Sequence, residues 1–134
     1  MKIVLKLLGV VFALLLLVIG VERLASESGE VVVLQTRTAA GDVAETRLWV
    51  VDQAGFAWLR SGSNASGWYQ RLEANSAVTV QRGEISFAAN AQPDVSMREL
   101  INAEMRAKYG WADSYISLLF GRDDAIPIRL IPSP

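Results

Sequence analysis

The sequence lacks both cysteine and histidine, although it is 134 residues long. Without these residues it cannot build Ser-His-Asp or Cys-His nucleophiles, imidazole acid–base catalysis, thiol redox chemistry or the usual zinc sites. Disulfides are excluded as well. An enzyme made from this chain must use carboxylates, tyrosine, lysine, arginine or backbone amides, or a bound cofactor that carries the reaction. The cofactor suits this composition best, and no metal is expected.

Net charge is also small, because 13 Lys and Arg residues oppose 14 Asp and Glu residues. The sequence has no basic stripe of the kind that binds nucleic acid, so no nucleic-acid partner is expected. Apolar residues make up 51% of the chain, and the N-terminus accounts for part of this excess. The remaining roughly 110 residues are about the size of one domain.

A hydrophobic stretch runs from Ile3 to Val21 and is interrupted only by Lys6. At ~1.5 Å per residue, a helix of this length is close to the ~30 Å core of a bilayer. The stretch predicts an uncleaved transmembrane anchor over residues 1–22. A cleaved signal peptide is the alternative, but only Leu24-Ala25-Ser26 comes near a cleavage site.

Charges on the two sides of this stretch predict its orientation. Lys2 and Lys6 precede its unbroken part, residues 7–21, whereas Glu22, Arg23, Glu27 and Glu30 follow it. By the positive-inside rule, the N-terminus faces the cytoplasm and the domain lies outside it, in the periplasm.

The rest of the chain is predicted to form a polar linker over residues 23–29 and one domain over residues 30–134. Alternation and turn residues predict six strands, at 30–38, 45–52, 56–60, 77–82, 84–89 and 125–131. Helical spacing predicts helices over 68–74, 97–109 and 112–120. Pro127 places the last strand at an edge or at a strand start. The fold class is α+β, mostly β, with the first three strands in a meander and the whole sheet in a closed or half-closed barrel.

One segment resembles a known family. Trp68-Tyr69-Gln70-Arg71-Leu72-Glu73-Ala74-Asn75, followed by Val78-Thr79-Val80, resembles the Trp-Tyr-x-x-Leu-x-Ala-Asn-Pro segment of the deazaflavin-dependent nitroreductase and quinone-reductase family. Three further segments fit the family in order: Thr46-Arg47-Leu48-Trp49, Ala112-Asp113-Ser114-Tyr115 and Ile126-Pro127-Ile128. The resemblance implies a six-stranded split β-barrel with short helices, related to pyridoxamine-phosphate oxidases, and a deazaflavin or FMN cofactor.

The resemblance also implies a set of cofactor-binding residues: Arg37, Arg47, Arg60, Ser61, Gly62, Ser63, Trp68 and Asn75. The arginines would meet the anionic tail of the cofactor. The loop that begins at Arg60 offers a guanidinium, two hydroxyls and backbone amides, which are the materials of a phosphate-binding nest. The alternatives are an ordinary polar loop and, for Trp68, a place in the core.

The resemblance also implies catalytic roles for Tyr109 and Tyr115, because this helical region covers the cofactor ring in the family. A tyrosine there would donate a hydrogen bond to a quinone or nitro oxygen before it donates a proton, since its ordinary pKa is about 10. An aromatic cluster that faces the core or the membrane is the alternative. Arg122, beside Asp123 and Asp124, is interpreted as a solvated turn charge.

The sequence departs from the family at the cofactor turn, where the family has Thr-x-Gly-Arg-Lys-Ser-Gly-x-x-Arg. Residues 37–44 read Arg-Thr-Ala-Ala-Gly-Asp-Val-Ala, so Ala39 and Ala44 stand where cations are expected. Two functions therefore stay open. One is a membrane-anchored oxidoreductase that passes hydride or electrons to a lipophilic acceptor, such as a quinone or nitro compound. The other is a non-catalytic barrel that binds a lipid, a cofactor or a partner protein. A homodimer is a family expectation.

We expect the full chain to stay with the membrane after a carbonate wash, because residues 7–21 form an unbroken apolar run. A truncated chain that begins at Glu30 should remain in the supernatant. Fractionation followed by N-terminal sequencing measures both. Recovery of a mature chain that begins near Ser26 would show instead that the segment is a cleaved signal.

Overall fold

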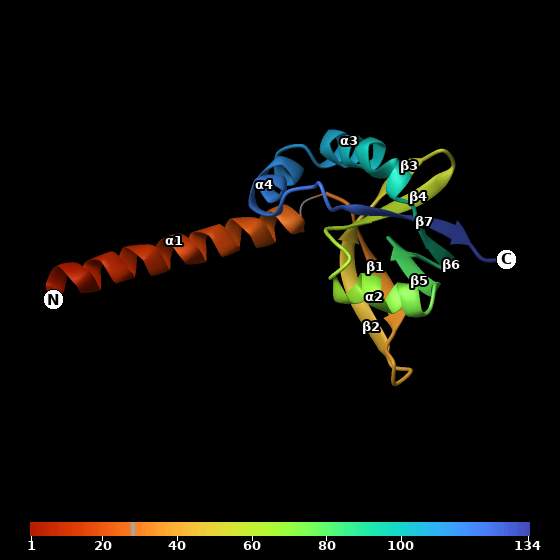
Figure 1. Ribbon diagram of the computed structural model, residues 1–134, viewed down its shortest axis with the longest axis horizontal. Coiled ribbons are helices and arrows are strands. Elements are labelled where there is room, and N and C mark those ends of the chain that lie inside the picture. Colours follow the sequence, from red (N-terminus) through yellow and green to blue (C-terminus); the bar gives the residue numbers. More distant parts are fainter. Residues whose placement is uncertain (28) are drawn as a thin grey trace.

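The computed structural model describes residues 1–27 and 29–134, so residue 28 of the predicted linker lies outside the described residues. Figure 1 shows a long helix that projects from a body of curled sheet and short helices. The helices are α1 (Lys2–Ser26), α2 (Gly67–Ala74), α3 (Arg98–Tyr109) and α4 (Trp111–Phe120), with a 3₁₀ turn at Val95–Met97. The strands are β1 (Val31–Arg37), β2 (Val43–Trp49), β3 (Val51–Gln53), β4 (Phe56–Ser61), β5 (Ala77–Arg82), β6 (Ile85–Pro93) and β7 (Ile126–Pro132).

The sheet confirms the mostly-β class, with seven strands where six were predicted. The difference lies in residues 45–52, which were expected to form one strand but are divided at Val50 into β2 and β3. The first part pairs with β1 and the second with β4, so the predicted meander exists but is bent. In the strand order β2-β1-β5-β6-β7-β4-β3, the two end strands are β2 and β3. Because β2 and β3 follow each other directly in the chain, the two ends of the sheet lie close together and the sheet curls into a barrel.

The last strand is interior, since β7 pairs with both β4 and β6. Pro127 is its second residue, which confirms the strand-start alternative and excludes the edge. A proline is tolerated there because the ladder has barely begun and little hydrogen bonding is lost.

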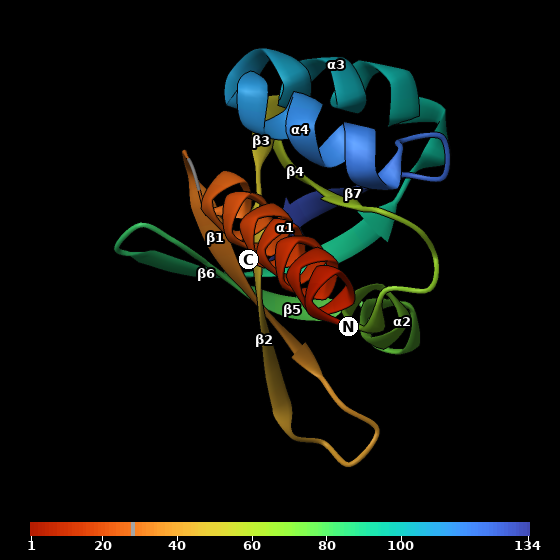
Figure 2. The ribbon, with the colours of Figure 1, turned by 90° about the vertical axis from the view of Figure 1, so that its left-hand side faces the viewer.

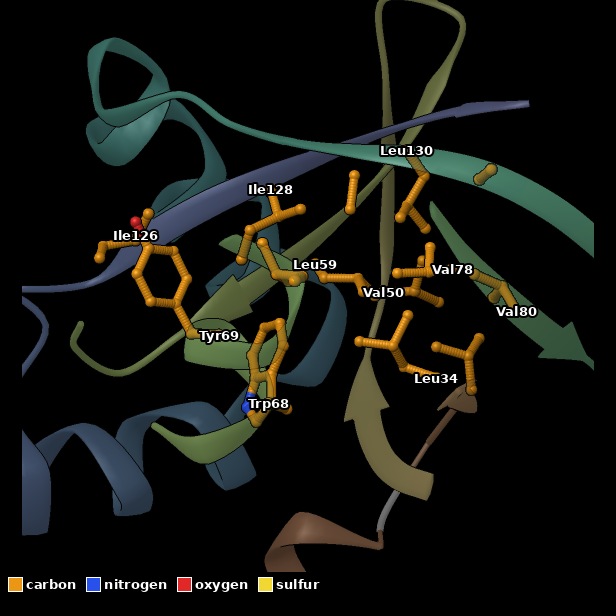
Figure 3. Close-up of a cluster of buried hydrophobic side chains, with 14 residues drawn as sticks. Leu34, Val50, Leu59, Trp68, Tyr69, Val78, Val80, Ile126, Ile128 and Leu130 are labelled. Carbon is orange, nitrogen blue, oxygen red and sulfur yellow. The ribbon is translucent and has the colours of Figure 1, made fainter. Parts of the chain in front are cut away.

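The main core fills the inside of the barrel (Figure 3). β1 buries every second residue, as a strand with one covered face must. Leu34, Leu59 and Leu130 are fully buried there. Trp68 and Tyr69 of α2 point into the same cluster, so this short helix seals one end of the barrel.

A second cluster lies outside the barrel, where α3 covers the outer face of β3 and β4. Tyr109, the last residue of α3, stacks on Trp49 with ring centroids 4.3 Å apart. Its hydroxyl accepts a hydrogen bond from the Val50 amide at 3.0 Å and donates one to the Glu30 carbonyl at 2.6 Å. One side chain thus satisfies backbone groups at the bend between β2 and β3. Gly110 follows with a φ of 55°, which separates α3 from α4.

Charged side chains surround the same junction. The Glu30 carboxylate accepts hydrogen bonds from Arg82 and Lys108, which hold its pKa at about 2. Arg82 also pairs with Asp52 of β3. These contacts tie β1, β3, β5 and α3 together at one corner of the body.

The N-terminal helix is long and apolar enough to cross a bilayer. It continues to Ser26, so residues 23–26 of the segment predicted as a linker are helical. Its end is held to the body, because Arg47 forms an ion pair with Glu27 at 2.7 Å. The Trp49 indole also donates to the Ser26 carbonyl at 2.8 Å.

Replacing Tyr109 with Phe should lower the free energy of unfolding by roughly 1–3 kcal/mol, because the buried Val50 amide loses its acceptor. Chemical denaturation of the full chain in detergent measures this. Tyr69→Phe is the matched control, since that hydroxyl donates to Glu73 on the same helix. Equal stabilities of the two variants would contradict the role assigned to Tyr109.

Candidate functional site

A cavity of about 210 Å³, here named the α1 cavity, lies where the end of α1 meets β2 and α4. It is lined by Glu22, Ser26, Arg47, Leu48, Trp49, Arg60, Met105, Ile116 and Arg122. Its wall thus combines three guanidinium groups with apolar and aromatic side chains. Two of the predicted cofactor residues, Arg47 and Arg60, are brought together here.

Arg60 is buried and engaged. It points to the outer face of β4, because its neighbours Leu59 and Ser61 are buried on the inner side. Its guanidinium donates to Asp113 of α4 at 2.6 Å and to Asn102 of α3 at 3.2 Å, and only 4% of its side chain is exposed. The cation predicted to meet a phosphate therefore holds two helices against the barrel.

The interpretation of Arg122 as a solvated turn charge is wrong. Its side chain is 15% exposed, and it donates to the same Asp113 oxygen at 3.2 Å. Burial, followed by the nearby Arg60 charge, lowers the pKa of Arg122 to about 10. Burial also lowers the pKa of Arg60, although Asp113 opposes this effect. Two buried cations thus share one carboxylate. Asp113 lies in a segment that resembles the family, but this role was not predicted from the sequence.

The loop after Arg60 turns away from it. The Ser61 hydroxyl is buried and donates to the Ser63 carbonyl at 2.7 Å. Ser63, beyond Gly62, lines a different hollow with Arg98 and Asp124. The hydroxyls of the predicted nest and the Arg60 guanidinium therefore do not face one space.

A second cavity, here named the α2 cavity, has a volume of about 470 Å³ and lies between the β1–β2 turn and α2. It is lined by Arg37, Thr38, Ala39, Gly67, Gln70, Arg71, Ala74 and Asn75. Arg37 donates to the Gly41 carbonyl, and Arg71 donates to the Thr36 hydroxyl. Across residues 1–27 and 29–134, no ion pair includes either arginine. Predicted residues Arg37 and Asn75 meet here, and Arg71 is a cation that sequence reasoning missed although it lies in the resembling segment.

The two cavities lie along one β-ribbon. Arg37 pairs with Val43, and Arg47 stands four residues further along β2 on the same face. At ~3.3 Å per residue, the two arginines are ~13 Å apart along the strand. Glu45 lies between them on that face and accepts from Gln35. An anion would therefore be favoured at the Arg37 end of this face and repelled at its middle, because the charge of Arg47 at the other end is already paired with Glu27.

The two predicted catalytic tyrosines are separated. Tyr109 is buried behind α3, and burial raises the pKa of its hydroxyl, which is bonded to the backbone. Tyr115 is half-buried on α4 and donates to the Val18 carbonyl of α1 at 3.2 Å. Their catalytic roles stay predictions. Tyr115 is the one that lies beside α1.

Replacing Asp113 with Asn should lower the free energy of unfolding by roughly 3–5 kcal/mol, because Arg60 and Arg122 would stay buried without their shared carboxylate. Thermal and chemical unfolding of the full chain measure this. Asp123→Asn, at an exposed carboxylate nearby, should change little. Equal effects would mean that the cluster contributes nothing to stability.

Comparison with known proteins identifies the fold. No protein-family profile and no curated protein match the sequence. Solved structures do match. A putative pyridoxamine 5'-phosphate oxidase from Listeria innocua has a TM-score of 0.58 at 16% identity, over 82% of this chain and 89% of that one. The heme storage protein HutZ from Vibrio cholerae has a TM-score of 0.60 at 19% identity, over 84% and 87%. An F420-H2 dependent reductase, FDR-A, has a TM-score of 0.56 at 21% identity, over 74% and 92%. The chain therefore has the split β-barrel fold that these structures share.

Proposed function

We propose that this chain is a membrane-anchored protein that binds a flavin or deazaflavin and passes hydride or electrons to a lipophilic acceptor, such as a quinone or nitro compound. The observation that carries the proposal is the α2 cavity, where Arg37 and Arg71 converge outside any ion pair formed by the described residues. Its volume of about 470 Å³ falls within the ~300–1,000 Å³ usual for small-molecule sites. Guanidinium groups of this kind suit the phosphate of such a cofactor.

The cofactor and the acceptor would bind at opposite ends of the β1–β2 ribbon. Arg37 and Arg71 would hold the anionic tail, with the Thr38 hydroxyl as a further hydrogen-bonding group. The bound cofactor would supply the redox chemistry. The α1 cavity, with Trp49 in its wall, offers an apolar and aromatic surface at the other end of the ribbon. This end lies against the helix that would anchor the protein, where a lipophilic acceptor would arrive from the bilayer.

The anchor completes the proposal. α1 would span the membrane with Lys2 and Lys6 on the cytoplasmic side, which puts the barrel in the periplasm. A homodimer remains a prediction.

A second candidate is a barrel without catalysis that binds a lipid, cofactor or partner protein. It is favoured by the engagement of three predicted site residues in internal contacts. Arg47 pairs with Glu27, Arg60 pairs with Asp113, and the Tyr109 hydroxyl bonds to the backbone. These contacts stabilise the fold whether or not a ligand is present.

Ligand titration separates the two candidates. The purified full chain in detergent is titrated with FMN and with the deazaflavin, with cofactor fluorescence as the readout. A charge-assisted contact contributes roughly 1.5–3 kcal/mol, so Arg37→Ala should weaken binding about tenfold or more. Arg60→Ala is unsuitable as a probe, because it would remove one cation from the buried cluster of Arg60, Asp113 and Arg122. This would change the stability of the fold as well as any ligand binding.

Arg106→Ala is the matched control, since Arg106 is an exposed arginine of α3 that lines neither cavity. Its affinity should equal that of the unmodified chain. Equal affinity of Arg37→Ala would remove the α2 cavity from the site. No binding of either cofactor by the unmodified chain would make the non-catalytic barrel the better account.

A further inference from the structure

Helix α4 presents large apolar side chains to the surroundings. Trp111, Leu118 and Phe120 are 57%, 84% and 71% exposed. The single charged residue of this helix, Asp113, is buried against Arg60 and Arg122. The exposed part of α4 therefore carries no charge, and on the face of Trp111 and Leu118 its one exposed polar side chain is the small hydroxyl of Ser114. A large exposed apolar surface on a folded domain marks a contact with something other than water.

The position of α4 indicates what it contacts. Tyr115 donates to the Val18 carbonyl, and Ile116 shares the α1 cavity with Glu22. In Figure 1, α4 lies on the side of the body that faces back along α1. In Figure 2, which looks along α1 from its N-terminal side, α4 runs across the view beside that helix. If α1 crosses a bilayer, α4 therefore lies roughly parallel to the membrane surface.

The depth of α4 follows from the spacing along α1. Glu22 is the first charged residue after the apolar run and belongs at the headgroups. Val18 precedes it by four residues, which places the Tyr115 contact ~6 Å deeper. Trp111 and Leu118 share a helix face with Tyr115, whereas Ile116 faces the α1 cavity. The exposed apolar face is thus on the side of α4 that is turned from the barrel toward the bilayer.

We propose that α4 is a second membrane contact, an interfacial helix whose apolar face is inserted into the lipid beside α1. This inference rests on the anchoring part of the proposed function. The surface is continuous with the lipid-facing surface of α1, which is exposed along its length. An inserted helix of this type lies roughly 5–10 Å into the headgroup and acyl boundary, in agreement with the level of Val18. Trp111 and Tyr115 are the aromatic types that favour this zone.

Two contacts with the membrane restrict the barrel more than one helix alone. With α1 alone, the orientation of the body relative to the membrane would be free. A second contact through α4 fixes the tilt of the body relative to the membrane. The α1 cavity, whose wall includes Ile116 of α4, is then held at the membrane surface. This gives a lipophilic molecule a short path from the bilayer to the cavity.

Spin labels at single cysteines test the inference in the full chain, because the sequence has no cysteine of its own. The labelled Leu118→Cys, Leu14→Cys and Ala107→Cys variants are placed in phosphatidylcholine and phosphatidylglycerol vesicles. Collision with oxygen and with a water-soluble nickel complex gives the depth of each label. The Leu118 label should lie roughly 5–10 Å below the phosphates. The Leu14 label should lie near the bilayer centre, and the Ala107 label, on the exposed face of α3, should be in water.

The outcomes are distinct. A Leu118 label as accessible to nickel as the Ala107 label, with Leu14 embedded, would overturn the α4 contact and leave the anchor intact. A Leu14 label in water would overturn both. A Leu118 label shielded from both reagents, with broadening from a second label nearby, would show that another copy of the chain covers α4 and would also overturn the lipid contact.

Discussion

The bend at Val50 is the constraint on which the rest of the structure depends. There β2 passes into β3, and the amide exposed by the break in the ladder is satisfied by the Tyr109 hydroxyl. Because β2 and β3 are the two ends of the sheet, this bend is what allows seven strands to curl into a barrel. The same tyrosine stacks on Trp49, which lines the α1 cavity and bonds to the end of α1. Barrel closure, the docking of α3 and the attachment of the N-terminal helix thus meet at one side chain.

A second constraint couples the barrel to α4. Two buried guanidinium groups, from β4 and from the turn after α4, share the Asp113 carboxylate. Such a cluster is costly to break, because removal of one partner leaves an uncompensated buried charge. It ties α4 to the barrel, and it removes Arg60 from the groups that can freely meet a ligand. Arg60 thus stabilises the fold, although the sequence resemblance implies that it binds the cofactor. The guanidinium groups that suit an anion are those of Arg37 and Arg71 beside α2.

The two ends of the β1–β2 ribbon therefore differ in chemical character. One end of the β1–β2 ribbon carries the α2 cavity, whose arginines suit a phosphate-bearing ligand. The other end carries the smaller α1 cavity, next to the apolar helix. A protein that transfers electrons between a polar cofactor and a lipophilic molecule needs these two environments within reach of each other. Arg37 of the α2 cavity and Arg47 of the α1 cavity lie ~13 Å apart along this ribbon.

The sequence by itself determined the local elements. Alternation in β1, helical spacing in α3 and the Trp-Tyr segment of α2 each predicted their element to within one residue at either end. The long apolar run predicted α1, which continues four residues beyond the predicted end. The resemblance added the split barrel. Tertiary structure alone decided the rest. The run Leu48-Trp49-Val50-Val51 is strand-like throughout, so nothing in it predicts the bend at Val50, where the freed amide bonds to a hydroxyl 59 residues away. The sharing of Asp113 by Arg60 and Arg122, and the convergence of Arg37 with Arg71, likewise join residues from different elements. A periodic pattern reports which face of an element is covered, whereas the partner that covers it is set by how the elements pack.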